Sequence, residues 1–194
     1  MMRTAFVLLA AAAASACVTV FPEPGAPPRL YPLEAAPAGA REPNAAGPVV
    51  LVGAVTGADA ALGPEIVWRR DGVIAYVEGA RWPDSAGALL RDLVLATVRA
   101  ESGARAAVRS SDRIPADVEL RWDVQAFEIV EEGGVVAARL ELDAMVVDAR
   151  TRAILATQHI ALREDVSTRS QASAAAALQR LARDAAARSA ALLR

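Results

Sequence analysis

The single cysteine of this 194-residue chain, Cys17, is the side chain with the clearest chemical role. A lone thiol can form neither an intramolecular disulfide nor a multi-cysteine metal site. Three small residues precede it, Ala14, Ser15 and Ala16, and a lipoprotein signal peptidase admits only small side chains before the cysteine that becomes acylated. The spacing therefore predicts a covalent lipid anchor on Cys17, with an S-diacylglycerol and an N-acyl group on the first mature residue.

Residues 1–16 have the pattern of an export signal. Arg3 gives a positive start, and Thr4 to Ala16 form an apolar stretch that is too short to span a bilayer as a helix. Ala-Ser-Ala would also suit ordinary signal peptidase, which would leave a soluble periplasmic protein. Val18, rather than an aspartate, follows the cysteine and favours the periplasmic face of the outer membrane.

Side chains for covalent chemistry are scarce. His159 is the only histidine, and we expect it on the solvent face of a strand. A Ser-His-Asp triad built on it is possible in principle, but the chain lacks a Gly-x-Ser-x-Gly elbow. Glu131-Glu132 and Glu164-Asp165 are acidic pairs at predicted turns. Lysine is absent, which excludes a P-loop, and a net charge of −2 gives no reason to expect nucleic acid. We therefore expect no enzyme, no metal site and no cofactor.

Two other features are candidates for contact with a partner or a second copy. Tyr76, Arg81 and Trp82 gather two aromatic rings and an arginine just before a predicted helix. We expect these residues to form either core packing with an arginine at its edge or a contact with a partner. Leu95 lies on the otherwise polar side of that helix, between two arginines, where it is either a single exposed leucine or part of a subunit interface.

The composition divides the chain into a signal, a tether and one domain. Eight of the eleven prolines lie between Pro22 and Pro48, so residues 17–47 are expected to form an extended spacer that follows the lipid anchor. Within it, Arg29–Leu33 is apolar and could add a short edge strand. Residues 48–194 have the pattern of one globular domain.

The domain is predicted to contain several strands and two amphipathic helices. Asp71-Gly72 is a strong two-residue turn signal between two short apolar runs. Strict alternation of apolar and polar residues predicts an antiparallel meander, and a shift of this alternation at Phe127 and Ile129 indicates a bulge or a change of face. The predicted strands are Val49–Val55, Ile66–Arg70, Val73–Val77 and Ala106–Arg109, followed by the meander strands from Val118, Val136 and Ile154.

Each helix has a recognisable start. The first begins near Trp82–Ser85, ends at Gly103 and carries a stripe of Leu89, Leu93, Ala96 and Ala100, with Leu90, Val94 and Thr97 beside it. The second begins with a capping box at Thr168–Gln171 and runs to Leu192. Two helices on one face of a mainly antiparallel sheet define the expected fold, an α+β two-layer sandwich.

Three segments resemble the family of ABC-type transport auxiliary lipoproteins. Pro64–Arg70 is similar to the family's strand that ends in a basic pair, and Ala75–Trp82 resembles its tyrosine-containing strand followed by Arg-Trp. Ala116–Glu128 is similar to its long central strand with Phe-Glu, and Tyr31-Pro32-Leu33 resembles its mature N-terminus. Two departures are the absence of Leu-Asp before Ile66-Val67 and the alanine at position 14.

This resemblance implies a non-enzymatic accessory lipoprotein of a lipid, or phospholipid, transport system. Its expected partners are an MCE-type substrate-binding protein and the ABC and permease subunits, contacted by a single copy or by a homo-oligomer. The resemblance brings no catalytic residues. Two other readings remain: a structural lipoprotein for envelope or cell-wall assembly that has no transporter partner, and a periplasmic hydrolase.

Overall fold

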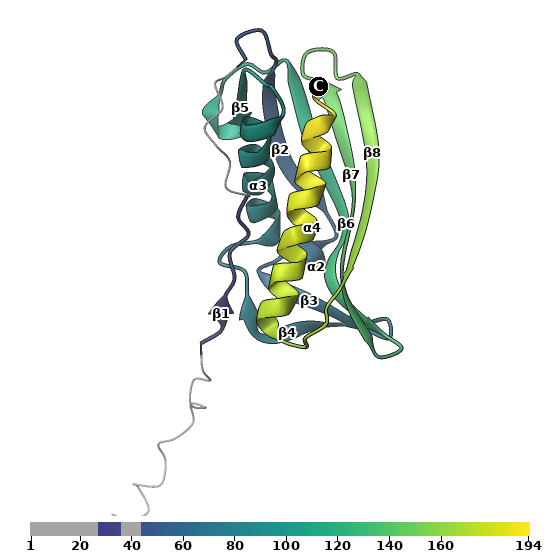
Figure 1. Ribbon diagram of the computed structural model, residues 1–194. Coiled ribbons are helices and arrows are strands. Elements are labelled where there is room, and N and C mark those ends of the chain that lie inside the picture. Colours follow the sequence, from purple (N-terminus) through teal and green to yellow (C-terminus); the bar gives the residue numbers. More distant parts are fainter. Residues whose placement is uncertain (1–26, 36–43) are drawn as a thin grey trace, which may run out of the picture.

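The computed structural model describes residues 27–35 and 44–194 (Figure 1). The predicted signal peptide and Cys17 lie outside the described residues. The centre of the fold is the predicted antiparallel meander of β6 (Val118–Glu132), β7 (Val135–Asp148) and β8 (Ile154–Asp165). The register between β6 and β7 shifts between Val124 and Ala126, which confirms a bulge just before Phe127.

The sheet is mixed because two shorter strands pair in parallel with the same edge of β6. β2 (Val49–Gly57) pairs with the first half of β6, and β3 (Glu65–Arg70) pairs with its last residues. β5 (Ala106–Arg109) extends the sheet beside β2, again in parallel. The predicted α+β class is confirmed, and the sheet is mixed where the sequence predicted a mainly antiparallel one.

On the side of β3 away from β6, a β-hairpin extends the sheet. β4 (Val73–Arg81) pairs with β3 through the predicted turn, in which Asp71 has φ 49° and Gly72 has φ 83°. Positive φ at both turn residues matches the twist of the flanking strands, which explains the Asp-Gly sequence. β1 (Arg29–Leu30) then adds a short parallel strand at the end of β4.

Part of the predicted tether therefore packs on the domain. The Tyr31 backbone N–H donates to the Arg81 carbonyl at 2.9 Å, and Leu33 is buried. The Glu34 carbonyl accepts a hydrogen bond from Arg183 Nε at 2.6 Å. These contacts confirm the predicted edge strand and place residues 27–35 against both β4 and the last helix.

Figure 1 shows the two long helices, α3 (Ala86–Glu101) and α4 (Gln171–Ala191), on the same side of the sheet. α3 contacts β2 and β5, α4 contacts β6, β7 and β8, and the helices pack against each other. Ser85 caps α3 by accepting a hydrogen bond from the Ala88 backbone N–H, and Gly103 follows the helix with φ 72°. Two short helices that the sequence analysis did not predict are α2 (Asp59–Leu62) and η2 (Ser110–Asp112).

The cap of α4 differs from the prediction. Ser170, not Thr168, is the N-cap, and its hydroxyl accepts a hydrogen bond from the Ser173 backbone N–H at 3.1 Å. The predicted capping-box partner, Gln171, instead donates its amide to the Glu78 carbonyl of β4 at 2.6 Å. A long-range contact with the hairpin has therefore replaced the expected local one.

Aromatic side chains join the layers of the core. Trp122 of β6 donates its indole N–H to the Ser189 hydroxyl of α4 at 2.9 Å, and both side chains are buried. Trp82 stacks on Phe127 of β6, with ring centroids 5.7 Å apart. Within the described part of the chain, no helix combines the length and the apolar character needed to cross a membrane.

Candidate functional site

The structure separates the predicted contact residues into buried and exposed ones. Trp82 is 3% exposed and belongs to the core through its stacking on Phe127. Tyr76 is 54% exposed on β4. Arg81 is partly exposed and forms an ion pair with Glu65 of β3 at 2.8 Å. The three residues therefore do not form one cluster, and only Tyr76 and Arg81 are accessible to a partner.

Leu95 is not exposed, and the expectation that it lies on a solvent face is wrong. It is 2% exposed and belongs to the core cluster. The neighbouring Arg99 donates to the Ala107 carbonyl of β5 at 2.9 and 3.0 Å, so this side of α3 covers β5. Of the predicted apolar face, Leu93 and the flanking Leu90, Val94 and Thr97 are buried, whereas Leu89, Ala96 and Ala100 are only half-buried.

An open cleft of about 640 Å³ lies between the β3–β4 hairpin and the start of α4. Trp68 pairs in register with Ala75, and Arg70 pairs with Val73, so these four residues share one face of the hairpin. Val73 is 69% exposed. The cleft therefore has a mainly apolar floor, and its volume is in the range of pockets that hold small molecules.

Charged groups of both signs surround this cleft. Arg70 and Arg169 share one partner, Glu131, at 2.8 and 3.1 Å. The Glu131 side chain is only 11% exposed, whereas those of Arg70 and Arg169 are 61% and 55% exposed. Asp71 and Glu78 also line the cleft and are exposed. The wall is therefore built from an arginine pair that is partly neutralised, together with two carboxylates.

Trp68 has an unusual environment in this cleft. The Arg70 guanidinium lies 5.8 Å from the ring centroid, within reach of a cation–π contact. The Trp68 indole N–H is buried and has no hydrogen-bond partner among the residues that the structure describes. A buried donor without a partner costs about 1–3 kcal/mol relative to a satisfied one. Because Trp68 lines the cleft and is partly exposed, its ring is a candidate for a ligand contact.

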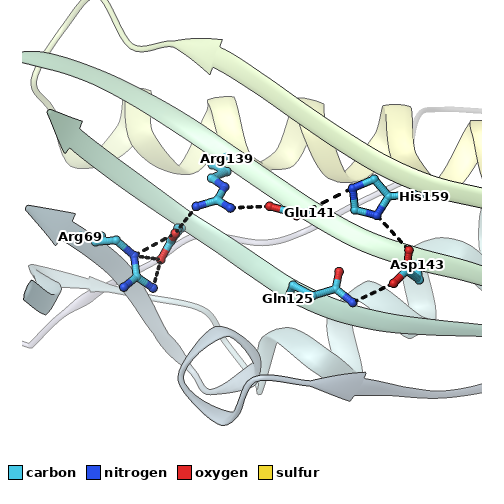
Figure 2. Close-up of polar contacts among 7 residues, drawn as sticks. Arg69, Gln125, Arg139, Glu141, Asp143 and His159 are labelled. Atoms are coloured by element: carbon cyan, nitrogen blue, oxygen red, sulfur yellow. Dashed lines mark hydrogen bonds and ion pairs between the residues drawn. The ribbon is translucent and has the colours of Figure 1, made fainter. Parts of the chain in front are cut away.

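A second polar cluster crosses the sheet face opposite the helices, and Figure 2 shows how its side chains follow one another across the strands. Arg69 holds the buried Glu128 through Nε at 2.9 and 3.1 Å, and Arg139 reaches the same carboxylate at 3.5 Å. The hydrogen bond to Glu128 raises the pKa of the Arg69 guanidinium above its usual value. Arg139 also pairs with Glu141. The cluster is an ion-pair ladder across β3, β6 and β7.

His159 stands at the other end of this ladder. Its Nδ1 is 2.9 Å from Asp143 Oδ1, and its Nε2 is 3.7 Å from Glu141 Oε1 (Figure 2). The imidazole is 56% exposed, as expected for the solvent face. Within residues 27–35 and 44–194, His159 hydrogen-bonds to no serine hydroxyl, and no group of three or more His, Cys, Asp or Glu side chains could hold a metal ion.

We expect His159→Ala to be silent. An exposed side chain with only solvent-screened contacts contributes little, so the free energy of unfolding should change by no more than about 0.5 kcal/mol. Complementation of a deletion strain should equal that of the parent protein. A null phenotype at normal protein abundance would revive the hydrolase reading.

Sequence reasoning missed the cleft and found only one of its residues, Tyr76. Trp68 and Arg70 were read as parts of a strand, and Arg169 as part of a cap. The sequence predicted the β-hairpin itself, through the Asp71-Gly72 turn, but not which of its faces lines a cleft. The position of that face beside the start of α4 depends on tertiary packing, which a local pattern does not carry.

The comparisons with known proteins agree with this architecture. The family model described as "ABC-type transport auxiliary lipoprotein component" matches residues 31–190, which is most of the chain. The chain therefore belongs to the family of ABC-type transport auxiliary lipoprotein components. No curated protein sequence matches significantly.

Solved structures share the fold. A crystal structure of a protein from Xanthomonas campestris, assigned to the DUF330 family, aligns with a TM-score of 0.70 at 23% identity, covering 84% of this chain and 89% of the other. A second crystal structure, of an uncharacterized protein, aligns with a TM-score of 0.65 at 16% identity, covering 85% and 97% of the two chains. At these identities the likeness concerns the fold alone.

Proposed function

We propose that this protein is a membrane-anchored, non-enzymatic accessory component of an ABC-type phospholipid transport system. In this proposal it is held by acylated Cys17 at the periplasmic face of the outer membrane. The family match over residues 31–190 carries the proposal, because an auxiliary lipoprotein acts beside a transporter. An MCE-type substrate-binding protein and the permease complex are the partners that we expect.

The β3–β4 hairpin is the surface that we assign to the partner contact. Ile74 is 46% exposed and Tyr76 is 54% exposed, and alternation along β4 places them on the same face. Among residues 27–35 and 44–194, the outer edge of β4 pairs only through Ala80 and Arg81 with β1, and the rest of such an edge can accept an added strand. Exposed tyrosines are enriched among the residues that dominate protein interfaces.

The described side chains favour binding over catalysis. His159 contacts only carboxylates, and the ion-pair ladder satisfies its own charges. A general acid–base or nucleophilic site needs a nucleophile and a base within hydrogen-bond reach of each other. Among the described residues, the hydrogen-bond and ion-pair partners of His159 are the carboxylates of Asp143 and Glu141.

Photocrosslinking from position 76 tests this proposal. We expect a photoreactive amino acid at Tyr76 to form an adduct with an MCE-domain protein in intact cells. Position 154, an equally exposed apolar residue at the start of β8, is the matched control and should form none. Tyr76→Ala should lower co-purification with that partner about tenfold while leaving the fold intact.

Failure of every transporter component to crosslink or co-purify from detergent extracts would contradict the proposal. Adducts with cell-wall or assembly proteins alone would instead support a structural envelope lipoprotein. Either result is independent of whether Cys17 carries a lipid.

A further inference from the structure

The cleft between the hairpin and α4 points to a ligand of its own. Its floor is formed by the face that Trp68, Val73, Ala75 and Val77 share, and its walls carry both cations and anions. We propose that this cleft binds one acyl chain of a zwitterionic phospholipid, with the headgroup at the charged wall. The inference rests on the proposed function, since a lipid transport system would supply such a ligand.

The apolar floor of the cleft favours an acyl chain as the ligand. Val73 is 69% exposed although it is large and apolar, so a ligand that covers it removes apolar surface from water. The volume of about 640 Å³ suits a single small-molecule ligand and not a second folded domain. Trp68 lines the cleft and offers an aromatic surface to the acyl chain.

The charged wall of the cleft favours a zwitterionic headgroup. Arg70 and Arg169 form ion pairs with Glu131 at 2.8 and 3.1 Å, and guanidinium groups are suited to phosphate oxygens. Asp71 and Glu78 line the same cleft and can face an ammonium group. Because Glu131 already neutralises part of the arginine charge, a bare anion gains less here than a headgroup that carries both charges.

Tryptophan quenching by a brominated lipid tests the inference directly. The chain has three tryptophans, of which Trp82 and Trp122 are 3% and 2% exposed, so contact quenching should report on Trp68. The protein is the full chain with Cys17→Ser, which removes the predicted covalent lipid. The probe is lysophosphatidylcholine brominated in its acyl chain, below its critical micelle concentration.

We expect saturable quenching that Trp68→Phe abolishes. Val73→Asp, which places a charge on the apolar floor, should weaken binding about tenfold or more, whereas the equally exposed Ile154→Asp at the far end of the sheet should leave it unchanged. Arg169→Ala should weaken lysophosphatidylcholine more than a brominated fatty acid. Inorganic phosphate alone should not change the emission.

Absence of quenching, or quenching that persists in Trp68→Phe, would overturn the inference. Equal affinity for the fatty acid and the zwitterionic lipid would overturn the assignment of the headgroup. A chain that fails to bind lipid but still crosslinks from position 76 would refute this inference alone. A chain that binds the lipid but forms no crosslink from position 76 would refute only the proposed partners.

Discussion

Trp82→Ala is expected to lower the free energy of unfolding by about 3–5 kcal/mol, the usual cost of truncating a buried tryptophan to alanine. The side chain is 3% exposed, and its ring stacks on Phe127 of the central strand β6. The substitution therefore removes the apolar contacts of a large ring and leaves a cavity between the start of α3 and the sheet. A domain of this size is stable by only about 5–15 kcal/mol, so the loss is severe.

Urea unfolding followed by circular dichroism measures this effect, with the full Cys17→Ser chain as the parent. Tyr76→Ala is the matched control, because that ring is 54% exposed and its removal should cost no more than about 0.5 kcal/mol. If Trp82→Ala were as stable as the parent but lost its transporter partner, Trp82 would be a contact residue and its assignment to the core would be wrong.

Arg69→Leu is expected to cost about 2–3 kcal/mol, because it leaves the buried Glu128 carboxylate with one weaker partner. The Glu128 side chain is 3% exposed, and after the substitution only Arg139, at 3.5 Å, would face it. Removing one partner of a buried ion pair typically costs about 3–5 kcal/mol. The lower figure applies here because Arg69 is 34% exposed and Arg139 remains.

The double variant Arg69→Leu/Glu128→Leu separates the cost of an unpaired charge from lost packing. It should be more stable than Arg69→Leu alone, because no buried carboxylate is then left without its guanidinium. Arg188→Leu, which breaks the exposed pair with Asp184, is the control and should cost no more than about 0.5 kcal/mol. A double variant less stable than the single one would show that lost packing, and not the unpaired charge, causes the loss of stability.

Local patterns predicted much of the fold because their causes are local. The Asp71-Gly72 turn follows from positive φ at both positions, and Gly103 ends α3 for the same reason. Asp148 closes the β7–β8 turn by accepting hydrogen bonds from the Arg150 and Thr151 backbone N–H groups, which lowers the pKa of its carboxyl. Residues such as these specify their own backbone conformation.

The remaining features depend on contacts between distant residues. The local sequences of Val49–Gly57 and Glu65–Arg70 do not indicate that both strands pair in parallel with β6. Leu95 was misplaced because β5 covers a side of α3 that looks polar in sequence. The cap of α4 was misplaced because Gln171 reaches the Glu78 carbonyl. The cleft, which forms at that same contact, could not be foreseen either.

The central claim is that a lipid on Cys17 holds this domain at a membrane. Metabolic labelling with palmitate, followed by fractionation, tests it most directly by comparing the natural chain with Cys17→Ser. We expect label and membrane association in the natural chain, and complete loss of both in the variant. An unlabelled natural protein recovered in the soluble periplasmic fraction would contradict the account.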